Sequence, residues 1–164
     1  KSVDSLSRAI AIDPAEKQGL IARARLERSL GHPEKAAADY TAALKFDPHS
    51  PYFARHALEE LLSDRGQNYM EAKQYKKAAE DFETLLKDDP DDAVFQLYLG
   101  DCRVALGELP AALSAYNKAI SLDPEGGSTY FARAHVYDLM HRPDLAGADR
   151  QMAQKLGFTP KPKR

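Results

Sequence analysis

Histidine and acidic side chains at two places in the chain have types and spacings that could support metal binding or acid-base chemistry. His56 and Glu59 match part of a metalloprotease helix pattern, but Glu60 stands where that pattern needs a second histidine. His135 and Asp138 lie three residues apart on one predicted helix, which supplies only two of the ligands that a zinc site needs. Neither pair predicts a metal site.

The single cysteine and an acidic run give the same result. Cys102 has no second cysteine to form an intrachain disulfide, and we interpret it as a small buried residue. Asp88, Asp89, Asp91 and Asp92 lack the central glycine and closing glutamate of a calcium loop, and we predict a turn in which Asp91 or Asp92 caps the next helix. The sequence predicts no catalytic residue, no metal and no cofactor, and therefore a protein that is not an enzyme.

Composition narrows the class of protein further. The chain has 164 residues, with 23 basic and 25 acidic side chains, a net charge of −2 and 43% hydrophobic residues, as is typical of a soluble globular protein. This balance gives no electrostatic basis for binding nucleic acid in bulk. No apolar run is long enough to span a membrane. The first ten residues lack the apolar stretch of a signal peptide, but a processed start would look the same, so cytoplasmic and periplasmic locations both stay open.

A repeat organises the whole chain. Asp-Pro pairs end four similar segments, and the spacings between their prolines are 34, 42 and 34 residues; the prolines are Pro14, Pro48, Pro90 and Pro124. A period of 34 with regular proline punctuation predicts a stacked array of helices.

Small residues recur in register within each repeat. One set occupies the first half of each repeat: Ala24, Gly66, Gly100 and Ala134. A second set follows twelve residues later: Ala36, Ala78, Ala112 and Ala146. Two helices approach closely only where neither carries bulk, so these positions predict the contact points of antiparallel helix pairs. Aromatic residues four positions further on, Tyr40, Phe82 and Tyr116, would fill the groove between neighbouring pairs.

The pattern resembles the tetratricopeptide repeat. The best match runs from Gln96 to Pro124 and contains Leu99-Gly100, Gly107, Ala112, Tyr116, Ala119 and Pro124. Arg65-Gly66 with Tyr69, and Arg133-Ala134 with Tyr137, resemble a common variant of the signature. The resemblance covers nearly the whole chain and implies an all-α fold, an α-solenoid in which antiparallel helix pairs form a right-handed superhelix.

The repeat spacing divides the chain into one array over residues 1–160. We assign the second helix of a truncated repeat to 1–14, full repeats to 17–50, 51–92 and 93–126, a terminal repeat to 127–158, and a basic tail to 159–164. The repeat at 51–92 is eight residues longer than its neighbours, and we predict that its first helix is extended; a short extra helix ending near Asp64 and Arg65 is the alternative. The insertion is either tolerated or forms a protruding partner contact through Tyr52 and Phe53.

The first helices of successive repeats line a concave groove in the family that this chain resembles, and that groove binds extended or helical peptides. Helical spacing maps ten residues onto it as candidate partner-binding residues: Arg25, Arg28, Asp64, Gln67, Leu97, Tyr98, Asp101, Phe131, His135 and Asp138. Tyr98 and Phe131 are either exposed anchors for a partner or packed between helices.

Some family members grip the terminal carboxylate of chaperone tails with lysine and asparagine in the groove. The matching positions here hold Ile21, Arg25, Asp64, Val94 and Tyr98, so we expect no such clamp. The leading hypothesis is a non-catalytic protein–protein interaction scaffold that binds a partner segment in its groove.

Two alternatives stay open. Val3, Leu6 and Ile10 would face a first helix that the sequence does not contain, and this predicts either a longer array or self-association into a homo-oligomer through the N-terminal helix. The other alternative is the accessory region of a larger enzyme. Arg150 occupies the position of the groove aromatics, and this predicts that the array ends there.

Overall fold

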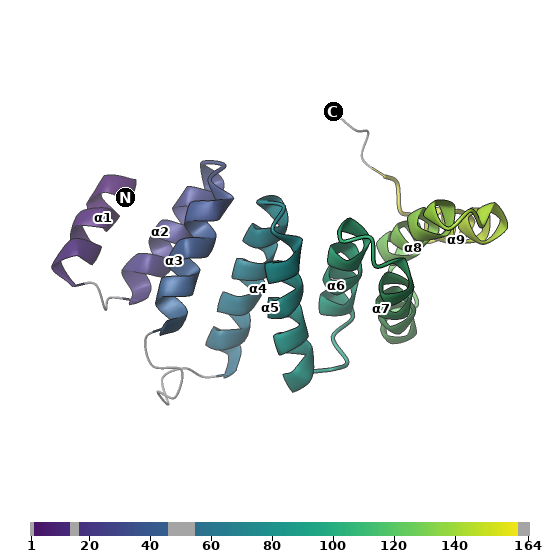
Figure 1. Ribbon diagram of the computed structural model, residues 1–164, viewed down its shortest axis with the longest axis horizontal. Coiled ribbons are helices and arrows are strands. Elements are labelled where there is room, and N and C mark those ends of the chain that lie inside the picture. Colours follow the sequence, from purple (N-terminus) through teal and green to yellow (C-terminus); the bar gives the residue numbers. More distant parts are fainter. Residues whose placement is uncertain (1, 14–16, 46–54, 161–164) are drawn as a thin grey trace. The chain divides into compact units, whose positions relative to one another are not determined.

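The computed structural model describes residues 2–13, 17–45 and 55–160, and these residues form nine α-helices and no strand (Figure 1). The predicted all-α fold is therefore confirmed. The helices are α1 Val3–Ile12, α2 Lys17–Ser29, α3 Pro33–Lys45, α4 Arg55–Glu71, α5 Tyr75–Asp88, α6 Ala93–Ala105, α7 Leu109–Leu122, α8 Gly127–Leu139 and α9 Pro143–Lys155. Over the described part of the chain, no helix combines the length and apolar character that a membrane span requires.

The helices group into two compact units, Lys1–Asp81 and Phe82–Arg164, and the division falls within α5. In the first unit α1 packs on α2, α2 on α3 and α3 on α4. In the second unit α6 packs on α7, α7 on α8 and α8 on α9, and α6 also touches α8. Neighbours in sequence are thus neighbours in space, as expected of a helical repeat.

Each helix pair is joined by a three-residue turn with the same backbone conformation. The middle residue of each turn is left-handed: φ is 78° at Gly31 and Gly107, 58° at Lys73 and 57° at His141. In the first turn Gly31 N–H donates to Arg28 C=O and His32 N–H to Glu27 C=O, and this paired arrangement recurs in the other three turns. These bonds satisfy the last carbonyl groups of the first helix and reverse the chain direction.

The small residues lie at the helix contacts that their spacing predicts. The six alanines of the two sets, Ala24, Ala36, Ala78, Ala112, Ala134 and Ala146, are all fully buried. Tyr40, Phe82 and Tyr116 are at most 1% exposed and fill the space beside them. Asp92 caps α6, because its side chain accepts a hydrogen bond of 2.8 Å from Phe95 N–H. Asp91 instead forms an ion pair of 2.7 Å with Lys118.

The irregular repeat contains the longest helix. α4 has 17 residues, against 13 in α2, α6 and α8. It runs without a break through Asp64 and Arg65, so the alternative of a short helix ending there is wrong. Tyr52 and Phe53 lie outside the described residues, and both their partner contact and the start of the helix at 51 stay predictions.

The two ends of the array differ in how they cover apolar surface. Leu6 is only 6% exposed because α1 packs on α2, so the expectation of an uncovered face is wrong for this residue. At the other end α9 finishes in a turn at Gly157, which brings Phe158 onto Phe131 with ring centroids 5.3 Å apart. Gly127 is required at this contact, since a Cβ there would lie 2.9 Å from the Cβ of Phe158. The C-terminal turn thus covers the start of α8.

Candidate partner-binding site

A recurring ion pair fixes the two helices of three repeats. Arg23 binds Asp39, Arg65 binds Asp81 and Arg133 binds Asp149, each through two hydrogen bonds across a separation of 16 residues. The distances lie between 2.5 and 2.8 Å. Two parallel bonds from a planar guanidinium fix direction as well as distance. The first helix of each of these repeats is therefore held at one rotation against the second.

The third repeat lacks this pair. The equivalent positions hold Leu99 and Ala115, which line an open pocket of about 460 Å³. Arg103, one turn further along α6, takes over the polar contacts and forms ion pairs with Glu83 and Glu108. The third repeat thus has apolar side chains at the two positions of this pair, and its ion pairs lie nearer to the turn.

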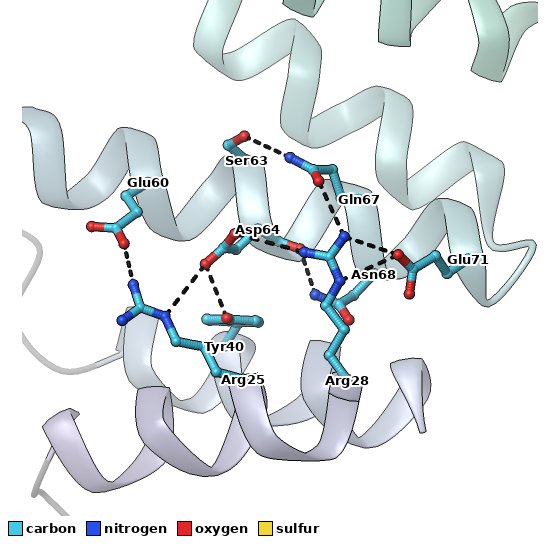
Figure 2. A network of polar contacts seen from close by, with 9 residues as sticks. All are labelled: Arg25, Arg28, Tyr40, Glu60, Ser63, Asp64, Gln67, Asn68 and Glu71. Atoms are coloured by element: carbon cyan, nitrogen blue, oxygen red, sulfur yellow. Dashed lines mark hydrogen bonds and ion pairs between the residues drawn. The ribbon is translucent and has the colours of Figure 1, made fainter. Parts of the chain in front are cut away.

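Polar side chains of α2 and α4 meet on one face of the first unit. Figure 2 shows Arg25 and Arg28 of α2 reaching toward the acidic and amide groups of α4. Arg25 binds Glu60 and lies 3.9 Å from the carboxylate of Asp64. Arg28 forms an ion pair of 2.9 Å with Glu71 and a hydrogen bond of 3.2 Å to the side-chain oxygen of Gln67. Both arginines are occupied by groups of this chain.

Asp64 lies at the centre of this network (Figure 2). The Tyr40 hydroxyl donates a hydrogen bond of 3.0 Å to Asp64, and Arg28 lies 4.0 Å from its other oxygen. Burial, together with this carboxylate, raises the pKa of Tyr40 above its ordinary value. Asp64 therefore has two arginines within 4.0 Å as counter-charges and accepts one hydrogen bond from the Tyr40 hydroxyl, so its charge is paired within the chain.

The second unit instead contains an open pocket of about 400 Å³ beside α6, α8 and α9. We call it the Asp101 pocket, and its lining is Asp101, Val104, Tyr116, Phe131, Ala132, His135, Asp138 and Arg150. Four of the predicted partner-binding residues, Asp101, Phe131, His135 and Asp138, are among them. Its surface is largely apolar with a few polar groups, the composition typical of ligand-binding pockets.

Tyr116 shapes one wall of the Asp101 pocket. Its hydroxyl donates a hydrogen bond of 2.7 Å to Asp101 of the same repeat. To reach that carboxylate the ring crosses Gly100, where a Cβ would lie 2.3 Å from Cε1 of the ring. Burial is the main cause of a raised pKa at Asp101, and the Tyr116 hydrogen bond opposes it. The pocket therefore contains a partly buried carboxyl group whose charged form is disfavoured.

The remaining predicted residues lie in different surroundings. Asp138 forms an ion pair with Arg150 at the pocket edge, and His135 is exposed. Tyr98 packs on Phe82 with ring centroids 5.3 Å apart, and Leu97 packs against the apolar cluster around Tyr116 and Val136. Tyr98 is thus half-buried and packs on Phe82, and its role as a partner-binding residue stays a prediction.

Sequence reasoning did not include four lining residues among the candidates: Val104, Tyr116, Ala132 and Arg150. Val104 was recoverable, because it follows Asp101 by one helical turn. Arg150 and Tyr116 come from second helices, whose side chains are not expected on this face. Among the described residues no three His, Cys, Asp or Glu side chains come together as metal ligands. Cys102 is fully buried, and burial raises the pKa of its thiol to about 12.

Helix pairs stacked in sequence order, with a pocket on the face formed by first helices, define a helical-repeat interaction protein. The tetratricopeptide repeat family model matches residues 18–50 and 63–127. The chain belongs to the tetratricopeptide repeat family, and its class is that of protein–protein interaction scaffolds.

Two curated proteins and one solved structure illustrate which known proteins this chain is similar to. The chain is 33% identical over 121 residues to the heat-shock protein cognate (HSC) co-chaperone sgt12 of Aspergillus fumigatus, covering 74% of this chain and 32% of that protein. It is 32% identical over 83 residues to U-box domain-containing protein 70 of Oryza sativa subsp. japonica, covering 51% of this chain and 10% of that protein. The structure titled MamA 41-end from Desulfovibrio magneticus RS-1 has the same fold, with a TM-score of 0.81 at 19% identity, covering 94% of this chain and 83% of that one. The chain thus spans a third or less of these two relatives' length.

Proposed function

We propose that this chain is a non-catalytic interaction module that binds a polypeptide segment of a partner in the Asp101 pocket. The observation that carries the proposal is the contrast between the two faces formed by first helices. The arginines on the face of the first unit bind glutamate and aspartate of α4, whereas the second unit offers an open volume of about 400 Å³.

The walls of the Asp101 pocket suit a side chain from a partner. Val104, Phe131 and Ala132 are partly exposed and form its apolar lining. Pockets of a few hundred Å³ with an apolar wall and a few polar groups are typical binding sites for a single inserted side chain or small ligand. Phe131 is already held by Phe158, so binding there costs little side-chain entropy.

The residues at the positions of the chaperone-tail clamp do not favour binding of a terminal carboxylate. Arg25 and Asp64 occupy two of the five positions and lie 3.9 Å apart as an ion pair. A carboxylate arriving there would have to displace Asp64 from both arginines. We therefore propose an internal peptide segment as the partner, although the name of the Aspergillus relative describes a co-chaperone.

A peptide-display selection tests this proposal. A random 12-residue library is selected against the wild-type protein, and the recovered peptides are measured for binding by fluorescence anisotropy. Ala132→Phe fills the Asp101 pocket and is expected to abolish binding of most recovered peptides. Ala111→Phe is the matched control, because Ala111 lines the other pocket of the second unit. Equal binding by both variants would refute the site.

Self-association through α1 is the alternative function. Ile12 at the end of α1 is 87% exposed, which leaves an apolar side chain for a second copy. Light scattering should then show a mass that rises with concentration, and Ile12→Asp should prevent the rise. The accessory region of a larger enzyme stays a hypothesis, in keeping with the greater length of the two relatives.

A further inference from the structure

We infer that the side chain which enters the Asp101 pocket is cationic, an arginine or lysine of the partner that pairs with Asp101. This inference rests on the proposed function and adds the chemistry of the partner residue. It starts from the charges in the pocket.

Asp101 has one polar partner among the described residues. Its Oδ1 accepts the hydrogen bond from the Tyr116 hydroxyl, and no cation of the described chain pairs with it. The other charged groups of the pocket are Asp138 and Arg150, which neutralise one another, while His135 is exposed. Of the two carboxylates that line the pocket, Asp101 is therefore the one without a cationic partner among the described residues.

The first unit contains an aspartate that accepts a tyrosine hydrogen bond and also has cationic partners. There the Tyr40 hydroxyl also donates to an aspartate, Asp64, and two arginines of the neighbouring first helix lie 3.9 and 4.0 Å from the two carboxylate oxygens (Figure 2). Tyr116 also donates to an aspartate, but Asp101 belongs to the repeat of Tyr116, whereas Asp64 belongs to the repeat that follows Tyr40. No arginine of the described chain pairs with Asp101. The first unit thus shows that arginine side chains can pair with a carboxylate of a first helix that also accepts a tyrosine hydrogen bond, and Asp101 lacks this counter-charge among the described residues.

A cationic side chain of a partner would stabilise the charged form of Asp101. Burial of a carboxylate without a counter-charge is unfavourable, and here it raises the pKa of Asp101. A guanidinium or ammonium group placed beside the carboxylate forms a charge-assisted hydrogen bond in a poorly solvated site. Val104 and Phe131 would cover the aliphatic stem of the arriving side chain. An acidic or phosphorylated segment would meet an uncompensated negative charge instead.

The peptide selection tests this inference separately from the proposed function. Peptides recovered on the wild-type protein should be enriched in one arginine or lysine next to apolar residues. Replacing that basic residue by methionine should weaken binding to the wild type by at least about tenfold. The same replacement should have little effect on Asp101→Asn, since the charge that it pairs with is gone. Asp144→Asn, which removes an exposed charge of α9, is the control for net charge and should behave as the wild type.

The outcomes distinguish the two proposals. One outcome would overturn the inference but not the proposed function. In that outcome Ala132→Phe abolishes binding, but the recovered peptides are not enriched in basic residues and bind Asp101→Asn as well as they bind the wild type. Both proposals would be overturned if Ala132→Phe left peptide binding unchanged, or if the selection recovered no binding peptides. A circular-dichroism melt of each variant verifies that a loss of binding is not a loss of fold.

Discussion

Arg133 and Asp149 join α8 to α9 through two hydrogen bonds of 2.8 Å each, although they lie 16 residues apart in the sequence. Their side chains are 17% and 9% exposed. The third repeat holds a leucine and an alanine, Leu99 and Ala115, at the corresponding positions. The repeat fold thus accepts either an ion pair or two apolar side chains at these positions, and both combinations occur in this chain.

Removing one partner of this pair should destabilise the protein. Asp149→Ala leaves the Arg133 guanidinium with Asn117 and with two tyrosine rings about 5.6–5.7 Å away. We expect a loss of about 2–3 kcal/mol in the free energy of unfolding, somewhat less than for a fully buried pair, measured by urea denaturation.

The matched control copies the third repeat. Arg133→Leu combined with Asp149→Ala removes both charges, and the free energy of unfolding should return to within about 1 kcal/mol of the wild type. If the double variant is as unstable as Asp149→Ala, the ion pair is not interchangeable with apolar contact.

Gly100 should be intolerant of alanine because of Tyr116. A Cβ at position 100 would overlap the ring that crosses it, so Gly100→Ala should destabilise by about 1–3 kcal/mol despite the higher helix propensity of alanine. In the background of Tyr116→Ala the overlap is absent, and the same change should stabilise by up to about 1 kcal/mol. An unchanged sign in the two backgrounds, measured by thermal unfolding, would contradict this explanation.

Asn68 is a buried polar side chain with one unused group. It is fully buried, its amide donates to the backbone oxygen of Asp64, and its own side-chain oxygen accepts no hydrogen bond. The corresponding positions of the next two repeats hold Cys102 and Val136, both fully buried. Asn68→Val should therefore raise the free energy of unfolding by about 1 kcal/mol, because it removes an unsatisfied acceptor.

Asn68→Asp tests whether the surroundings of this side chain are as poorly solvated as its burial indicates. It keeps the size of the side chain and adds a buried charge, so its urea midpoint should fall below that of the wild type. A stabilising aspartate would show that the site is not as dry as its burial indicates.

Asp101 should make the stability of the protein depend on pH. Burial raises the pKa of Asp101 in the folded state above the ordinary aspartate value of 3.8, so the folded state binds the proton more tightly than the unfolded state. The unfolding free energy should therefore fall as pH rises from below 3.8 through the raised pKa, and stay lower above it. Asp101→Asn should lack this contribution, so its stability relative to the wild type should increase across that interval, as measured by urea titrations at several pH values.

The fold was predictable because its determinants are local in the sequence. Small residues such as Ala24 and Ala36 recur at fixed spacings, and each marks a place where two helices must approach. The candidate site was predictable in part for a similar reason. Asp101 lies on one first helix, and Phe131, His135 and Asp138 share one face of the next first helix. Tyr98 was placed on the correct helix, but its packing on Phe82 depends on the direction of the side chain.

The sequence by itself determined the repeat, the helix pairs and the class of protein, because period and residue size depend only on the order of residues along the chain. Only the tertiary structure decided which charges are already neutralised. Asp64 and Asp101 are both acidic residues of first helices, yet one meets two arginines and the other meets only a tyrosine. That difference depends on ångström-scale distances between side chains of separate helices, and electrostatic pairing falls off over that scale.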